Sequence, residues 1–443
     1  MKHYAIHAFT ALIIASLALP IYAQEPIQWN LKQCIDYAIE NNLSLKKADN
    51  QIQQDKLNKQ TKQWSRLPSV DANASQGWNW GRSPSPIDNR YSNVRSANTN
   101  FGLSTNLPLF TGLELPNQYA LSKIQLKASL ADLAKAKEDL SIQVTNSYIQ
   151  VLFNQEICEV ARHQVELSQE QLDMGRAKYE LGKLSYAELT ELESRLKQDE
   201  MQYVETRNNY QLALLDLSQL LELPTPDNFR ILPLDEHVYQ QKLSPPDQIY
   251  VQALQDKPVI LAAQLRSEGA KKNIRLAQSG FMPKLSFNAS ISSGYYSVQG
   301  RDAEGFRHQL SNNLSKYVGF SLSIPIFNRM NTINQVRSAK IDFNNQRIQL
   351  EEQKKGLYKE IQQAWYSATA AQTKFDASSV ALDANRQSFE LIKEKYELGK
   401  ANNLEFNEAK LSLMKAESDL IQAKYNYLLR TKILNFYKGE PIE

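Results

Sequence analysis

The chain has 443 residues, and its 51 Lys and Arg nearly balance its 48 Asp and Glu, which leaves a formal net charge of +3. This balance gives no global electrostatic basis for binding nucleic acid. The hydrophobic fraction of 42% permits a folded protein, and the 15 Gly and 16 Pro residues are few and clustered. Scarce, clustered helix breakers favour long uninterrupted helices.

The first 23 residues have the pattern of a signal peptide. Lys2 supplies a positive start, Phe9–Leu19 is an apolar core, and Pro20 precedes a small residue, Ala23, at the expected cleavage position. The apolar stretch is too short to cross a bilayer as a helix, although a retained N-terminal anchor is the alternative. We therefore predict that residues 1–23 are removed and that the mature chain is exported.

A helix is predicted over residues 30–66, and two strands follow it at about 67–80 and 97–110. In both strands apolar residues alternate with Ser, Asn and Gly at a period of two, which is typical of a strand with two different faces. The same pattern returns at about 284–296 and 317–327. Aromatic residues gather near the strand ends: Trp78, Trp80, Tyr295, Tyr296 and Tyr317.

Alternating strands of about ten residues with aromatic residues at their ends indicate an outer-membrane β-barrel. The alternative is a soluble sheet over a hydrophobic core. The polar stretches Gly81–Ser96 and Val298–Lys316 would be the extracellular loops. Four strands are too few to close a membrane barrel, and lipid tolerates no unpaired strand edge. We therefore predict an oligomer, in which three copies of the chain would supply twelve strands.

Residues 113–180 are predicted to form one helix, which would be on the order of 100 Å long. Its apolar residues recur at steps of three and four, as in a coiled coil, so it should pack against partner helices along its length. A second helix is predicted over 184–221, and a Pro-rich linker follows at 222–246. The apolar seam of the long helix comprises Leu126, Leu130, Leu133, Leu140, Val144, Val151, Cys158, Ala161, Val165 and Leu172.

The second half of the chain repeats the first. The hexapeptide KYELGK occurs at Lys178–Lys183 and again at Lys395–Lys400, about half a chain apart. Such an echo predicts a tandem duplication, with repeats at 24–221 and 247–443. The elements predicted in the second repeat are a helix from 247 to about 280, the two strands given above, a long helix over 330–398 and a helix over 401–437.

The chain lacks the usual signs of catalysis. It has no nucleophile elbow, phosphate-binding loop or metal-spaced cluster, so we predict no catalytic, cofactor-binding or metal site and no enzyme activity. Cys34 and Cys158 each lie inside a helical pattern, and we interpret them as small core residues.

Taken together, these features resemble the TolC-like outer-membrane efflux protein family. The resemblance rests on CIDYAIENNLSL and IYVQALQDKPVI, on the strand entries LPSV and MPKL, on the strand exits LPLF and IPIF, and on both KYELGK copies. It implies an α+β membrane protein: a homotrimeric twelve-stranded barrel continuous with a long α-helical periplasmic tunnel.

The resemblance also implies a function. The chain would be the outer-membrane channel of a tripartite efflux or type I secretion system in a Gram-negative-type envelope, conducting substrates passively. Its partners would be outer-membrane lipid, a periplasmic adaptor (membrane-fusion) protein and an inner-membrane transporter. Two alternatives are a periplasmic adaptor built from a helical hairpin and a barrel-embedded enzyme such as a lipid hydrolase.

Particular residues acquire roles through the resemblance. Gly182 and Gly399 would form the turns at the periplasmic tip, where Lys183 and Lys400 would also contact the adaptor. A tight turn between helices favours glycine on physical grounds as well.

The tip constriction would be lined by Glu405 and Glu408, whose spacing places both on one helix face. Tyr396 matches a family tyrosine that holds the tip shut, and Glu188 occupies in the first repeat the position of Glu405 in the second. The chain departs from the family at Ala401, where an arginine would make a closing ion pair.

Overall fold

The computed structural model describes residues 27–84, 90–224, 229–234, 243–300, 302 and 304–440. The predicted signal peptide lies outside the described residues, as do parts of the predicted loops and linker. The chain divides into two compact units. The first contains the chain up to Lys46 together with Ala136–Ala253 and Lys359–Glu443, and the second contains Lys47–Lys135 and Leu254–Tyr358.

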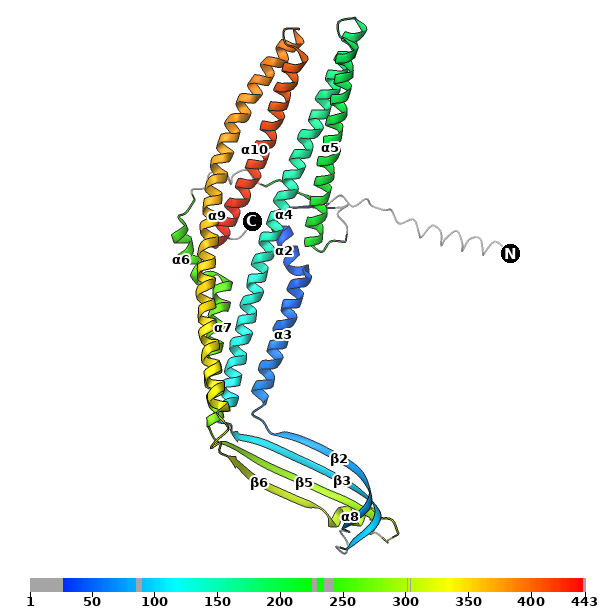
Figure 1. Ribbon diagram of the computed structural model, residues 1–443, viewed down its shortest axis with the longest axis vertical. Coiled ribbons are helices and arrows are strands. Elements are labelled where there is room, and N and C mark those ends of the chain that lie inside the picture. The colour runs from blue at the N-terminus through cyan, green and yellow to red at the C-terminus, as the bar shows by residue number, and fades with distance from the viewer. Residues whose placement is uncertain are drawn as a thin grey trace, which may run out of the picture. The chain divides into compact units, whose positions relative to one another are not determined.

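The second unit contains a four-stranded antiparallel sheet, to which both halves of the chain contribute two strands. The strands lie in the order β2 (Ser69–Pro84), β3 (Tyr91–Phe110), β5 (Lys284–Val298) and β6 (Ser315–Ser323), side by side in Figure 1. Among the described residues, β2 pairs only with β3 and β6 only with β5. Both outer edges of this sheet therefore keep free backbone groups within a single chain.

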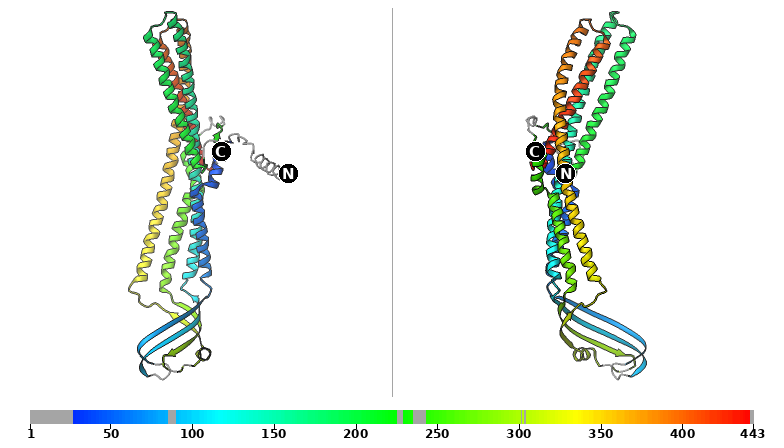
Figure 2. Two further views of the ribbon diagram at one scale, coloured as in Figure 1. Left: turned by 90° about the vertical axis from the view of Figure 1, so that its right-hand side faces the viewer. Right: turned by 60° about the vertical axis from the view of Figure 1, so that its left-hand side comes forward.

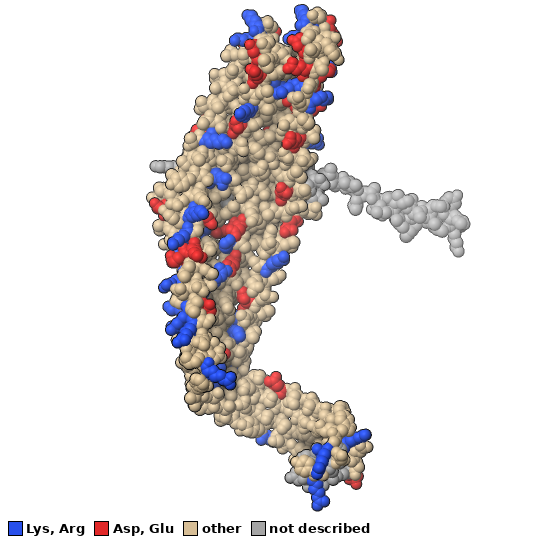
Figure 3. Space-filling model, viewed as in Figure 1, with Lys and Arg blue, Asp and Glu red and all other residues tan. Residues whose placement is uncertain are grey.

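The two faces of the sheet differ in polarity. On one face Leu103 lies opposite Ile291, and on the other Asn106 lies opposite Asn288, with a hydrogen bond of 2.6 Å between their side chains. The apolar face is exposed to an unusual degree, since Val318 is 68% and Phe320 70% exposed. The visible surface of the sheet carries few charges in Figure 3. A large exposed apolar surface of this kind marks contact with a partner or with lipid.

The predicted extracellular loops contain regular structure. β2 and β3 stay paired as far as Pro84 and Tyr91, well inside the stretch predicted as loop. The pairing is made by backbone N–H and C=O groups, which polar residues such as Ser and Asn also carry. The second loop contains the short helix α8 (Phe306–Asn312), whose Phe306 ring lies 5.2 Å from that of Tyr295. β6 ends at Ser323, before the predicted end near 327.

The helices reflect the duplication in their lengths. α4 (Glu114–Glu180) and α9 (Asn331–Glu397) have 67 residues each, and α5 (Tyr186–Leu220) and α10 (Asn403–Tyr437) have 35 each. In the first unit α5 runs back along α4, and α10 runs back along α9 (Figures 1 and 2). We call these two pairs the first and the second hairpin.

The helices predicted over 30–66 and from 247 to about 280 are each divided in two. The first consists of α2 (Leu31–Asn41) and α3 (Leu43–Trp64), and the second of α6 (Pro246–Asp256) and α7 (Pro258–Gln278). Lys257 is extended, with ψ 124°, as expected for a residue that precedes proline. A single continuous helix was therefore the wrong prediction in both places.

The predicted linker also contains regular structure. β4 (Phe229–Ile231) pairs in parallel with β1 (Ile27–Trp29). Tyr148 of α4 is fully buried and donates its hydroxyl to the carbonyls of Trp29, at 3.2 Å, and Leu232, at 2.5 Å. This contact fastens the small sheet to the helices of the first unit.

The apolar seam predicted for α4 is largely buried. Val144 and Val151 are fully buried, whereas Leu130 is 47% exposed and departs from the prediction. Cys34 and Cys158 are buried free thiols, which confirms their interpretation as core residues. Burial raises the pKa of Cys34 to about 12, so this thiol is unreactive.

Candidate functional site

The ends of the two hairpins, here called the tip, contain all eight residues that were predicted to have a site role. Both KYELGK copies form the same turn. The amide of Gly182 donates to the Tyr179 carbonyl at 2.8 Å, and that of Lys183 donates to the Lys178 carbonyl at 2.8 Å. This pair of bonds defines the Schellman motif, which satisfies carbonyls at a helix end.

The second copy has the corresponding bonds, from Gly399 to Tyr396 at 3.0 Å and from Lys400 to Lys395 at 2.7 Å. Gly182 and Gly399 have φ values of +69° and +71°, the left-handed conformation in which only glycine avoids strain. The repeated hexapeptide is thus a repeated helix C-cap.

Each returning helix begins with a capping box. In α10 the amide of Asn402 donates to the Glu405 carboxylate at 3.0 Å, and the amide of Glu405 donates to Asn402 Oδ1 at 2.8 Å. In α5 Ser185 and Glu188 make the same reciprocal pair at 2.8 and 3.2 Å. Donation from the Ser185 amide, and then from the Ser185 hydroxyl at 2.7 Å, to the Glu188 carboxylate lowers the pKa of Glu188. Glu188 and Glu405 therefore stabilise the starts of α5 and α10, independently of any role in the constriction.

Tyr396 lies where the two hairpins meet. It is buried, and its ring centre lies 4.8 Å from that of Phe406. Lys178 of the first hairpin places its ammonium 4.6 Å from the centre of the Tyr396 ring, close enough for a cation–π interaction. Burial first, and then the nearby charge of Glu188, raise the pKa of Tyr396. The structure thus brings Tyr396 and Glu188 together.

Glu405 and Glu408 lie at the surface of the second hairpin. Both are exposed, and neither takes part in an ion pair among the described residues. Ala401 packs at the edge of the apolar cluster that contains Phe389, Tyr396 and Phe406, so it contributes contact rather than charge. A single chain therefore presents the two carboxylates without enclosing them.

The apex of each hairpin exposes apolar side chains that the sequence analysis did not single out. Leu181 and Leu398 are each 71% exposed, beside the exposed Lys183 and Lys400. Basic and acidic side chains gather at both hairpin ends in Figure 3. Each apex therefore presents an exposed apolar side chain next to an exposed lysine.

Further from the apex, a buried ion pair joins the hairpins. Lys410 of α10 is 1% exposed, and its ammonium lies 3.3 Å from Asp199 Oδ2 of α5 and 2.5 Å from Ser168 Oγ of α4. Ser168 also donates to Asp199. Burial lowers the pKa of Lys410, against the opposing effect of Asp199. Sequence reasoning missed this cluster, because its three residues are far apart in the chain and ordinary on helix surfaces.

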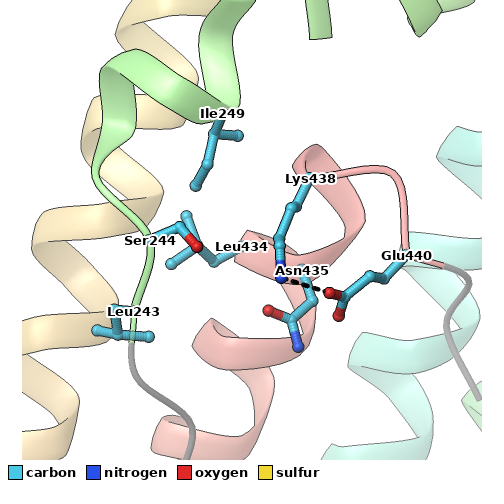
Figure 4. A pocket seen from close by; sticks show the side chains of 7 residues that line it. All are labelled: Leu243, Ser244, Ile249, Leu434, Asn435, Lys438 and Glu440. Atoms are coloured by element: carbon cyan, nitrogen blue, oxygen red, sulfur yellow. Dashed lines mark hydrogen bonds and ion pairs between the residues drawn. The ribbon is translucent and has the colours of Figure 1, made fainter. Parts of the chain in front are cut away.

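A pocket lies at the other end of α10, between that helix and the start of α6 (Figure 4). Lys438 and Glu440 form an ion pair of 2.6 Å at its rim. No group of three or more His, Cys, Asp or Glu in the described ranges is arranged to hold a metal ion. Nor does any helix of those ranges combine the length and apolarity needed to cross a bilayer.

Comparison with known proteins identifies similar chains. The family model described as outer membrane efflux protein matches residues 34–222 and again residues 249–439. The alkaline protease secretion protein AprF of Pseudomonas aeruginosa is 23% identical over 340 residues, which cover 76% of this chain and 69% of that protein. The outer membrane protein TolC of Escherichia coli is 23% identical over 348 residues, which cover 77% of this chain and 70% of that protein.

Among solved structures, the CmeC outer membrane channel of Campylobacter jejuni has a similar fold. Its TM-score is 0.77 at 19% sequence identity, with 92% of this chain and 85% of that chain covered. At this level of identity the likeness concerns the fold alone.

Proposed function

Because this chain belongs to the outer membrane efflux protein family, we propose that it assembles as a homotrimer whose tip docks on a periplasmic adaptor protein. The family match covers both halves of the chain, and it confirms the prediction of an outer-membrane export channel that is not an enzyme. The alternatives of an adaptor and of a barrel-embedded enzyme are thereby set aside.

The free edges of the sheet support the trimer. In the part of the chain that the structure describes, the outer edges of β2 and β6 have no paired strand, and such backbone groups cannot face lipid without a hydrogen-bonding partner. Pairing β6 of one chain with β2 of the next closes the sheet, and three chains of four strands give a twelve-stranded barrel. The exposed apolar face that carries Val318 and Phe320 then meets the membrane, and the Ser- and Asn-rich face lines the lumen.

The exposed apexes support docking on an adaptor. Leu181 and Leu398 are exposed on turns that are closed by backbone hydrogen bonds, so an adaptor could bind them without ordering a loop. Lys183 and Lys400 lie beside them and would pair with acidic side chains of the partner. An inner-membrane transporter would supply the energy, since the chain itself offers a passive conduit.

Closure of the tip in this chain relies on Tyr396. Lys178 of the first hairpin covers its ring in a cation–π contact and so helps to hold the second hairpin. This contact does not require an arginine at position 401, where the chain has Ala401. Three copies of Glu405 and Glu408 would form carboxylate rings around the opening, a recurring cause of cation selectivity.

The observation that carries the proposal is the pair of unpaired sheet edges in a chain of this family. The test is ion conduction by the purified protein in a planar lipid bilayer. Discrete, cation-selective conductance steps are expected. Protein that inserts into the bilayer but never conducts, even when Tyr396 is replaced to loosen the tip, would rule out the channel assembly.

A further inference from the structure

The outer edge of β5 changes partner toward the end of the sheet that is remote from the helices. β6 pairs with β5 only as far as Ser292, which lies opposite the first residue of β6, Ser315. β5 continues to Val298 and stays paired there with β3 on its other side. The backbone groups of this last part of β5 that point away from β3 therefore need a partner other than a strand.

The short helix α8 supplies that partner. The amide of Tyr296 donates to Gln309 Oε1 at 2.9 Å, and Gln309 Nε2 donates to the Tyr296 carbonyl at 3.0 Å, as a paired strand would. One turn later, Asn313 Nδ2 donates to the Gly294 carbonyl at 2.7 Å. Four residues of helix and two residues of strand both advance by about 6–7 Å, so α8 follows the edge of β5 in the place that β6 leaves.

α8 also packs onto the apolar face of the sheet. The Phe306 ring centre lies 5.2 Å from that of Tyr295 and 6.5 Å from that of Phe101. Ser293, which lies opposite Phe101 on the same face, donates its hydroxyl to the Leu310 carbonyl at 2.6 Å. Contacts with both the edge and the face of β5 thus fix the position of α8.

The side of α8 that points away from β5 is polar and exposed. Arg307 and Ser311 stand two residues before and two residues after Gln309, which places both about 160° around the helix from it. Since Gln309 points at β5, these two side chains point away from β5. Both are exposed in the single chain.

The opposite edge of the sheet has a strand that is longer than β6. β2 has 16 residues and β6 has nine. Ser69 begins β2 and Ser323 ends β6 at the end of the sheet that is next to the helices (Figure 1). A β6 from another chain that pairs antiparallel with β2 from this end would therefore reach about Gly77, and Trp78–Pro84 would keep a free outer edge.

We propose that α8 of one chain covers this free part of the β2 edge of the next chain. The occupant is a second copy of the chain, because α8 leads directly into β6, the strand that pairs with the same β2 in the proposed trimer. The inference rests on that proposed assembly. It leaves no part of the outer β2 edge to face lipid, where an unpaired backbone group is costly.

The lengths of the two elements assign the contacts. Ser311 lies nearer to β6 and comes beside Trp78 of the next chain, and Arg307 lies one turn further away and comes beside Trp80. In the single chain these two indole rings are 61% and 69% exposed. A guanidinium over an indole ring makes a favourable cation–π contact, so Arg307 and Trp80 suit one another.

The test is cross-linking between two differently tagged chains in one trimer. One chain carries Ser311→Cys and the other carries Trp78→Cys, so oxidation gives a covalent dimer only if the cysteines of two chains meet. The native Cys34 and Cys158 are buried, and chains without added cysteines give the background. Native mass spectrometry counts the chains in the same samples. We expect trimers and a strong covalent dimer on non-reducing electrophoresis.

The matched control replaces Trp78→Cys by Val70→Cys, at an exposed position on the same face near the other end of β2. This mixture should give only background. Background yield from both mixtures in trimeric protein, as with lipid in place of α8, would overturn the proposal and leave the trimer standing. Equal yields from both would also contradict it. A protein that is not trimeric would overturn the contact and the proposed assembly together.

The dissociation temperature of the trimer in SDS tests the contact of Arg307. Arg307→Ala and Trp80→Ala should each lower this temperature, and the double variant should dissociate no earlier than the more sensitive single variant, since both changes remove one contact. His308→Ala, at the next exposed residue of α8, is the control and should match wild type. Losses that add in the double variant would contradict a contact between Arg307 and Trp80. If Trp78→Cys prevents assembly, cross-linking of Arg307→Cys with Trp80→Cys decides by the same criteria.

Discussion

The ammonium of Lys178 lies 4.6 Å from the centre of the Tyr396 ring, so the last turn of α4 contacts the last turn of α9. Both residues belong to KYELGK, Lys178 as the first residue of one copy and Tyr396 as the second residue of the other. The duplicated turn is therefore used asymmetrically. In the first copy it supplies the cation, and in the second it supplies the buried ring.

Alkaline pH should loosen this contact. The pKa of Tyr396 is raised, so its neutral phenol is the form that the closed tip favours. This stabilisation is complete below the ordinary tyrosine pKa of about 10 and is lost as the pH rises through the raised value. We expect conductance to increase above about pH 10 in wild type and to stay flat in Tyr396→Phe. An equal rise in both proteins would assign the effect to other groups.

The tip glycines should be sensitive to substitution. Gly182→Ala and Gly399→Ala each force a side chain into the left-handed region and should destabilise the tip by about 1 kcal/mol. Gly356→Ala is the control, because this glycine lies within α9 and a Cβ there meets no atom within 4 Å. It should raise the melting temperature, since alanine favours a helix by about 0.5–1 kcal/mol. Higher melting temperatures for Gly182→Ala and Gly399→Ala, together with a lower one for Gly356→Ala, would contradict the assignment of the turns.

The charge of Glu405 and Glu408 should control cation block. Because Glu405 also caps α10, glutamine is the better substitution, since it keeps the capping box while removing the charge. We expect the Glu405→Gln and Glu408→Gln pair to weaken block by multivalent cations at least tenfold, with little change in thermal stability.

The matched pair for this experiment is Glu397→Gln with Glu394→Gln, at two exposed positions on α9. If block by multivalent cations is unchanged in the Glu405 and Glu408 variant, these residues do not line the constriction. Weakened block in the control as well would indicate a diffuse effect of the tip charge.

The two faces of β6 should respond differently to charge. Val318→Lys places a cation on the apolar face, where the cost in a bilayer is about 2–4 kcal/mol near the midplane. Ser321→Lys places the same cation on the polar face and should be tolerated. Outer-membrane fractionation with a heat-stability assay would compare them. Equal assembly of both variants would contradict the membrane-facing assignment of Val318.

Much of the fold could be predicted because it depends on periodicity. The alternation around Phe101 and Phe320 indicated strands, and the absence of Gly and Pro from Asn117 to Met174 indicated a long helix. Local deviations were harder to predict. α2 ends at Asn42, although the sequence around this residue has a helical pattern. α8 forms where Phe306 packs against Tyr295 of β5.

The site could be predicted only in part for a similar reason. The tip glycines could be predicted, but the capping boxes were not, although Ser185 and Asn402 each precede a glutamate by three residues, a known helix-start pattern. The Lys410 cluster was not readable, because its ion pair joins residues 211 positions apart that come together only when the hairpins pack. Contacts between helices depend on packing, which the pattern along a single helix does not determine.

The number of chains in the assembled particle tests the central claim most directly. Native mass spectrometry of the detergent-purified protein should give a single species with three chains, because three of these four-stranded sheets would close into one barrel with no edge exposed to lipid. A stable, folded single chain in the membrane fraction, or a particle with a different number of chains, would contradict the account.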